Sequence, residues 1–358
     1  MDGRRRKKAQ AELTGPYRFM QLIWIILSHP QYEWDVMIRY VDGRKETVEA
    51  LAEKCRASGL FRNIYSTTES GLSDSSGKKM GRMLEVMWYL VTFRRKKYMK
   101  RVIERGVGRS DYDLFCAENS FSFFGSAMMN QSQKVPTILL EDGIWEYTDV
   151  ITPFGFLTTL VGRFLFWIGI VNFITKKNFK WNRYCYKYAS MPDRLLEKDY
   201  RSVRKLYTND SIMLKYNKVI GQLYQIDDDH YDAMLFTSVS ASKTKYEDNR
   251  RFFAWVEKTY HNRRVLLKEH PTDDFSYALK GIDTERKYKV VPGELVVQTA
   301  GDADIVFMFP STLMLALLEG QEVYVIHFDP EIMYPRYQHD YDEMMRCFTG
   351  LNIHVIEL

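Results

Sequence analysis

The chain has 358 residues, with a hydrophobic fraction of 46% and a charged fraction of 27%, which excludes an intrinsically disordered protein and predicts two globular domains. Its net charge of +5 is too small to indicate nucleic-acid binding, and the sequence contains no basic and aromatic pattern of that kind. The four cysteines stand far apart without a metal-ligand spacing, and no signal peptide is recognisable, so we expect a reduced, cytoplasmic protein.

Strand and helix patterns alternate in the N-terminal part of the chain, which predicts a parallel sheet covered by helices. A short, polar first strand is expected near residues 8–13, and a helical pattern over residues 20–27 ends at His29-Pro30, a helix stop. Further strands are predicted over residues 34–41, 61–66, 112–117 and 135–140, and helices over residues 45–58 and 82–104.

The C-terminal part of the chain repeats this alternation. Strands are predicted over residues 232–239, 264–268, 288–291, 304–309, 322–328 and 352–357, and helices over residues 246–260 and 313–318. The sequence therefore predicts an α/β fold with an N-terminal Rossmann-like domain over residues 1–150, a helical connection over residues 151–200 and a C-terminal Rossmann-like domain over residues 201–358.

Residues 153–174 form an almost wholly apolar segment, and three lysines follow it closely. The segment is long enough to cross a bilayer, which takes about 20 apolar residues. A crossing would, however, place the acidic motif and the histidine motif described below on opposite sides of the membrane. Two alternatives remain: a buried helix at the domain interface, or peripheral contact of residues 153–183 with an anionic membrane at the inner face of the cell membrane.

Three short motifs each follow an apolar strand, at the position where open α/β sheets carry their chemistry. The first is Glu141-Asp142-Gly143. Two adjacent carboxylates repel each other, so one of them can act as a general base, and the glycine permits a tight turn. An ordinary loop after a strand has the same composition, so this motif alone does not decide between a catalytic site and a loop.

The second and third motifs supply groups that suit a phosphate. In His270-Pro271 the proline restricts the backbone of the histidine to an extended form, and a histidine can donate a proton to a leaving phosphate near neutral pH. Ser311-Thr312 stands where a predicted strand ends and a helix begins. Backbone N–H groups and hydroxyls at such a place bind phosphate, although Ser and Thr are also ordinary helix caps.

Other polar clusters do not predict a site. Asp227-Asp228-Asp229 and Asp302-Ala303-Asp304 have the Asp-x-Asp spacing of metal-dependent sugar transferases, but both precede a strand, on the wrong side of a sheet for chemistry. The remaining histidines form no ligand spacing. Because the sequence has neither a Walker-type loop nor a G-x-G-x-x-G motif, neither a metal nor ATP nor NAD is predicted.

Taken together, the three motifs resemble those of bacterial sialyltransferases with the GT-B fold, above all the lipooligosaccharide sialyltransferases (glycosyltransferase family 52) and the related polysialyltransferases. Those families carry an acidic-acidic-glycine, a His-Pro and a Ser-Ser or Ser-Thr motif in this order. Thr14 to Tyr17 also resembles the turn after the family's first strand, and Val291 to Leu295 resembles a Pro-x-Glu segment. The resemblance implies a GT-B-like fold, with two Rossmann-like domains facing each other across a cleft.

The resemblance also implies an activity: inverting, metal-independent transfer of sialic acid from CMP-sialic acid to a hydroxyl of a surface glycan of the lipooligosaccharide or capsule type. Asp142 would take the proton from the acceptor hydroxyl, with Glu141 as the second candidate base, and Gly143 would shape the turn. His270 would protonate the departing phosphate. No cofactor or metal would be required.

Donor binding would fall to Pro271, Ser311, Thr312 and Glu294, with the two hydroxyls on the phosphate and Glu294 on the ribose. Three alternatives remain open. The same fold could use another donor, such as CMP-Kdo or a UDP-hexose. The chain could also be a non-catalytic, membrane-associated protein of polysaccharide assembly, or an unrelated α/β nucleotide-binding protein. Cleavage of a nucleotide sugar would distinguish a glycosyltransferase from the non-catalytic protein and from the unrelated nucleotide-binding protein.

Overall fold

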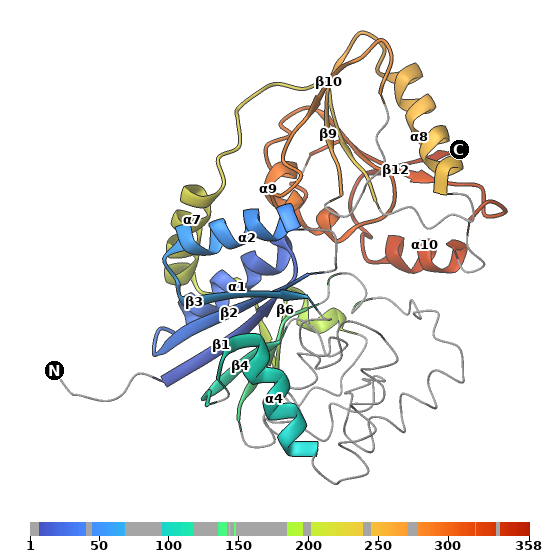
Figure 1. Ribbon diagram of the computed structural model, residues 1–358. Helices are drawn as coiled ribbons and strands as arrows, with labels where there is room; N and C mark the ends of the chain where they lie inside the picture. Colours follow the sequence, from blue (N-terminus) through green and yellow to red (C-terminus); the bar gives the residue numbers. More distant parts are fainter. Residues whose placement is uncertain are drawn as a thin grey trace. The chain divides into compact units, whose positions relative to one another are not determined.

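The computed structural model divides the chain into two compact units (Figure 1). The first comprises Met1–Asp142 and Ile151–Leu223, and the second comprises Gly143–Val150 and Tyr224–Leu358. The structure describes residues 7–40, 45–68, 95–109, 111–117, 135–141, 143, 147, 185–195, 202–238, 245–270, 278–318, 320–333 and 337–358.

The first unit contains a seven-stranded sheet in the order β3-β2-β1-β4-β5-β6-β7, and all neighbouring strands are parallel. The strands are β1 (Lys7–Leu13), β2 (Tyr32–Tyr40), β3 (Phe61–Thr68), β4 (Leu114–Ala117), β5 (Thr137–Leu139), β6 (Cys185–Ala189) and β7 (Val203–Lys205). The helices are α1 (Pro16–Ser28), α2 (Lys45–Ser58), α4 (Arg95–Val107), the short η4 (Pro192–Arg194) and α7 (Asp210–Leu223). Helices α2 and α4 both contact β2 and β3, from opposite faces of the sheet (Figure 1).

The polar strand β1 lies near the middle of this sheet, between β2 and β4. Gln10 and Glu12 are fully buried there. Burial of a charge requires a partner, and Arg39 on the neighbouring strand supplies it, with its Nε donating to the Glu12 carboxylate at 2.8 Å. The low hydropathy of this strand therefore does not place it at an edge.

Helix α1 begins with Pro16 at its first position and is buried along most of its length. It ends at His29, whose backbone N–H donates to the carbonyl of Ile26 and whose ring nitrogen Nδ1 lies 2.8 Å from the carbonyl oxygen of Ile25. The helix stop predicted at His29-Pro30 is thus confirmed, and this histidine is occupied in capping the helix.

The second unit contains a six-stranded, wholly parallel sheet in the order β10-β9-β8-β11-β12-β13. The strands are β8 (Ala233–Phe236), β9 (Arg264–Lys268), β10 (Asp283–Arg286), β11 (Asp304–Phe307), β12 (Val323–His327) and β13 (Ile353–Glu357). The helices are α8 (Lys245–Thr259), α9 (Gly293–Val297), the 3₁₀ helix η5 (Thr312–Ala316) and α10 (Tyr337–Arg346). Both sheets follow the Rossmann strand order, which reverses between β1 and β4 and between β8 and β11.

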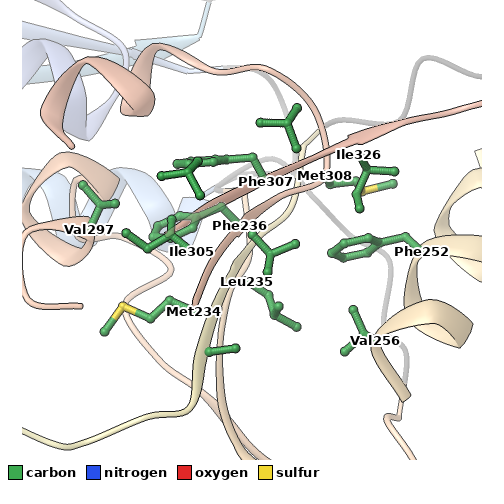
Figure 2. Packing of buried hydrophobic residues seen from close by; sticks show 14 of the residues in the cluster. Met234, Leu235, Phe236, Phe252, Val256, Val297, Ile305, Phe307, Met308 and Ile326 are labelled. Atoms are coloured by element: carbon green, nitrogen blue, oxygen red, sulfur yellow. The ribbon is translucent and has the colours of Figure 1, made fainter. Parts of the chain in front are cut away.

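The core of the second unit lies around the two middle strands of its sheet (Figure 2). Phe236 of β8 and Phe307 of β11 stack with their ring centroids 5.1 Å apart. Phe252 and Val256 of α8 and Val297 of α9 belong to the same buried cluster. Thr237 directly follows Phe236, and Ser311 follows Met308 of the same cluster by three residues, so both polar residues are attached to the buried core.

Two predicted elements of the second unit differ from the structure. Residues 288–291, predicted as a strand, form a turn, and the edge strand β10 is the preceding polar stretch Asp283–Arg286. Glu285 of this strand forms ion pairs with Arg264 and Lys287. Charged side chains therefore stabilise this edge strand, which has no apolar residues. The helix predicted over residues 313–318 is the 3₁₀ helix η5.

The middle of the chain is organised differently from the predicted division. Strands β6 and β7 and helix α7 belong to the first unit, although the predicted connection and C-terminal domain included them. Helix α7 packs on α1 and α2 of that unit. Residues 153–183 lie outside the described residues. None of the helices that the structure describes combines the length and the apolar character needed to cross a membrane.

Candidate active site

Three polar segments gather at the carboxyl edge of the sheet in the second unit. Thr237 follows β8, His270 follows β9 after one intervening residue, and Ser311-Thr312 follow β11. The strands β9, β8 and β11 are neighbours in this order. The second and third motifs therefore lie on one edge of one sheet, at the point where the strand order reverses, which is where open α/β sheets bind ligands.

His270 is anchored through its backbone. Its N–H donates to the Thr237 hydroxyl oxygen at 3.0 Å, and the N–H of Thr237 donates to the carbonyl of Lys268 at 3.2 Å. Pro271 lies outside the described residues. Thr237 is not among the predicted site residues, although it is a hydroxyl residue that follows an apolar strand, as Ser311 was predicted to be.

Ser311 is the residue before η5 and has an extended backbone. Its hydroxyl accepts a hydrogen bond from the backbone N–H of Leu313 at 3.3 Å. Thr312 is the first residue of η5. Because η5 is only 5 residues long, its dipole is small, and the two hydroxyls are the groups at this edge best suited to hold an anion.

The glycine of the acidic motif lies against the third motif. Gly143 has a φ of +79°, a conformation that side chains rarely adopt, and a Cβ at this position would lie 2.6 Å from Oγ1 of Thr312. Asp142 lies outside the described residues but directly precedes this glycine in the chain. The structure thus places the glycine of the first motif, which is far from the third motif in the sequence, against Thr312.

Glu294 lies in the first turn of α9, which packs against η5. The two elements are so close at Gly293 that a Cβ there would meet the Leu313 side chain at 2.7 Å. The helix that carries Glu294 therefore lies beside the helix that begins at Thr312, and the role of Glu294 in donor binding stays a prediction.

A buried lysine, Lys268, supports the turn before α9. Its Nζ donates to the backbone carbonyls of Glu269 at 3.3 Å and of Lys289 at 3.4 Å. Burial lowers the pKa of Lys268 to about 8, and the nearby carboxylate of Glu294 partly offsets this effect. The lysine is only 5% exposed.

In the first unit, Glu141 is fully buried at the end of β5. Its carboxylate accepts hydrogen bonds from the Ser190 backbone N–H at 2.8 Å, from the Ser190 hydroxyl at 2.7 Å, from Gln21 Nε2 at 3.2 Å and from the Tyr17 hydroxyl. Tyr17 and Gln21 lie one turn apart in α1. These contacts give Glu141 a structural task, joining the ends of β5 and β6 to the start of α1.

The two Asp-x-Asp pairs precede β8 and β11 in the chain, and protein partners hold their carboxylates. Asp227 and Asp229 form ion pairs with Lys287, at 3.3 and 3.0 Å, and Tyr260 donates to Asp304 at 3.1 Å. Within the part of the chain that the structure describes, no group of three or more His, Cys, Asp or Glu side chains is arranged to hold a metal ion.

Neither a protein-family model nor a curated protein matches the sequence. Solved structures do match. The structure of LpCGTa in complex with UDP is 10% identical, with a TM-score of 0.50, and the match covers 98% of this chain and 84% of that one. The glycosyltransferase SnogD from Streptomyces nogalater is 12% identical, with a TM-score of 0.49, and coverage of 99% and 87%. The GT-B domain of a sialyltransferase from Photobacterium damselae is 12% identical, with a TM-score of 0.47, and coverage of 98% and 99%.

At these identities the likeness concerns the fold alone. Together with the two Rossmann strand orders, it confirms the predicted α/β fold of the GT-B type, with two Rossmann-like domains.

Proposed function

We propose that the protein is a glycosyltransferase that moves a sugar from a nucleotide-sugar donor to a hydroxyl group, and that its donor is CMP-sialic acid. The observation that carries the proposal is the gathering of His270, Ser311, Thr312 and Gly143 at the carboxyl edge of the second sheet. A proton donor and two hydroxyls at the reversal point of a Rossmann sheet form a site for a leaving phosphate.

In the proposed reaction a base removes the proton from the acceptor hydroxyl, whose oxygen attacks the anomeric carbon of the donor. The bond from that carbon to the phosphate oxygen breaks with inversion, and CMP departs. His270 donates a proton or a hydrogen bond to the departing phosphate, which Ser311 and Thr312 hold. Glu294 binds the ribose hydroxyls, as the sequence resemblance implies.

Asp142 is proposed as the base rather than Glu141. The Glu141 carboxylate already accepts four hydrogen bonds, and taking a proton would disrupt them. The adjacent Asp142 carries the same chemical group and precedes Gly143, which lies against Thr312.

A metal is not part of the proposal. A CMP sugar leaves with a single phosphate, whose charge a histidine and hydroxyls can stabilise without the cation that diphosphate donors usually need. The acceptor is proposed to be a lipooligosaccharide or capsule-type glycan, on the sequence resemblance alone. Contact of residues 153–183 with an anionic membrane and a cytoplasmic location stay predictions.

A UDP-hexose donor is the second candidate. The neighbour LpCGTa was solved in complex with UDP, so this fold accommodates a uridine nucleotide. The two donors differ in their number of phosphates, and the same assay separates them.

The test is CMP release from CMP-sialic acid by the purified full chain, in EDTA, with a galactose-ended acceptor. We expect release by the wild type and its loss in His270→Ala. His230→Ala is the matched control, since His230 is an exposed histidine at the amino edge of the same sheet. UDP release from a UDP-hexose in place of CMP release would select the second candidate. Absence of release from either donor and from CMP-Kdo would reject the enzyme.

A further inference from the structure

The hydrogen bonds between β8 and β9 continue beyond the two strands through one side chain. Backbone pairing ends with Phe236 opposite Lys268. Thr237 then donates its N–H to the Lys268 carbonyl at 3.2 Å, and its hydroxyl accepts the N–H of His270 at 3.0 Å. The side chain of Thr237 thus takes the place of a backbone carbonyl and binds His270, two residues beyond the end of β9.

Two constraints fix the backbone of His270. Its N–H is bound by Thr237, and the following proline restricts its backbone to an extended form. Thr237 is itself stiff, since a β-branched side chain has few rotamers, and it is only 9% exposed, which shields the bond from water. The direction of the His270 imidazole then depends on its own side-chain torsions alone.

Thr237 also stands between the two groups that are proposed to contact the phosphate. On its β11 side, the preceding residue Phe236 accepts the N–H of Met308 at 3.0 Å, three residues before Ser311. On its β9 side it holds His270. A displacement of Thr237 would therefore alter the spacing between the histidine and the hydroxyls.

We propose that Thr237 is a positioning residue, whose hydroxyl holds His270 in the orientation that serves the departing phosphate. The inference rests on the proposed function of His270. It assigns to Thr237 no contact with the donor. Loss of its hydroxyl should therefore reduce turnover much more than donor binding.

The test compares Thr237→Val, which keeps the shape and removes the acceptor, with Thr237→Ser, which keeps the acceptor. Thr284→Val is the matched control, because Thr284 is a partly buried threonine on β10 whose hydroxyl donates to the Ile282 carbonyl at 3.5 Å. We expect kcat for CMP release to fall about 10- to 100-fold in Thr237→Val, with KM for the donor changed less than about threefold. Thr237→Ser and Thr284→Val should stay within about threefold of the wild type.

A second readout does not depend on turnover. The imidazole C–H resonances of His270, assigned by their loss in His270→Ala, should shift and titrate at a different pH in Thr237→Val but not in Thr237→Ser or Thr284→Val. If no donor is turned over by the wild type, the proposed function fails while this readout still tests the positioning. Should Thr237→Val not fold, Thr237→Ala takes its place, because a smaller side chain lets water reach the His270 N–H. Wild-type kcat together with an unchanged His270 titration would overturn the inference.

Discussion

The carboxylate of Glu141 accepts two hydrogen bonds from Ser190, one from its backbone N–H at 2.8 Å and one from its hydroxyl at 2.7 Å. Glu141 follows β5 and Ser190 follows β6, so the pair joins the ends of neighbouring strands. A carboxylate held in this way belongs to the architecture of the first unit. The two acids of the motif, identical in chemical type, therefore have different expected roles.

Replacement of these two acids should separate stability from catalysis. Glu141→Ala leaves buried donors unsatisfied and should lower the free energy of unfolding by about 3 kcal/mol. Asp142→Asn should lower kcat at least about 100-fold, because the amide cannot accept the acceptor proton. Urea unfolding and CMP release measure the two effects. Ser190→Ala, which removes one of the four bonds, should show a smaller loss of stability. A Glu141→Ala variant of wild-type stability would contradict the structural role.

Gly143→Ala should damage both stability and donor binding. The added Cβ meets Thr312 Oγ1 at 2.6 Å, and the φ of +79° strains any side chain. Gly301→Ala is the matched control, with a φ of +59° but open space around its Cβ. We expect about 1 kcal/mol of destabilisation for Gly301→Ala from backbone strain alone, and clearly more for Gly143→Ala. If thermal unfolding shows the same loss of stability in Gly143→Ala and Gly301→Ala, the contact of Gly143 with Thr312 is not tight.

Ser311→Ala tests whether the third motif is more than a helix cap. The variant should raise KM for the donor about 10-fold, because a phosphate ligand is lost, and should lose about 1 kcal/mol of stability with the cap bond to Leu313. Asn209→Ala provides the comparison: Asn209 accepts the N–H groups of Ser211 and Ile212 at the start of α7, at 3.1 and 3.2 Å. It should lose about 1 kcal/mol of stability and leave KM unchanged. An unchanged KM in Ser311→Ala would show that Ser311 caps the helix η5 and does not bind the donor.

The buried amine of Lys268 should make stability depend on pH. Its pKa is about 8 in the folded protein, against an ordinary value of 10.5. Between these values the unfolded chain binds a proton that the folded chain does not, so this group makes the protein more stable as the pH rises from about 8 to about 10.5. The gain is at most about 3 kcal/mol.

Lys268→Met should remove that gain, and Lys258→Met, at an exposed position of α8, should retain it. The measurement is the free energy of unfolding of the three proteins at pH 7.5 and pH 10. Because other groups also titrate in this range, the difference between wild type and variant is the relevant quantity. A pH dependence of Lys268→Met equal to that of the wild type would contradict burial of the charge.

Elements with a clear apolar period were predictable from the sequence. The helix Lys45–Ser58 and the strand Arg264–Lys268 have the predicted bounds, since apolar spacing defines both and Gly59, with a φ of +65°, ends the helix. The edge strand Asp283–Arg286 was not predictable, because its four residues are polar and it is held by backbone pairing with β9 and by the ion pair of Glu285 with Arg264. Hydropathy does not report backbone pairing.

In the candidate site too, features that depend on local pattern were predictable, and features that depend on distant residues were not. The placement of His270 and Ser311 after strands follows from local pattern, and the structure has both there. The role of Thr237 depends on a hydrogen bond to a residue of another strand, and the burial of Glu141 depends on Tyr17, Gln21 and Ser190. Glu141 and Asp142 carry the same chemical group, and their expected roles differ because of such distant partners. A single sequence does not show which distant residues become partners.

The division of the chain also has a consequence for the order of folding. Residues 143–150 belong to the second unit, yet they leave the ribosome before β6, β7 and α7, which complete the first. The approach of Gly143 to Thr312 can form only when nearly the whole chain has been translated. A fragment beginning at residue 224 would carry the second sheet without the glycine that lies against Thr312, so this part of the site is assembled late, and only on an unbroken chain.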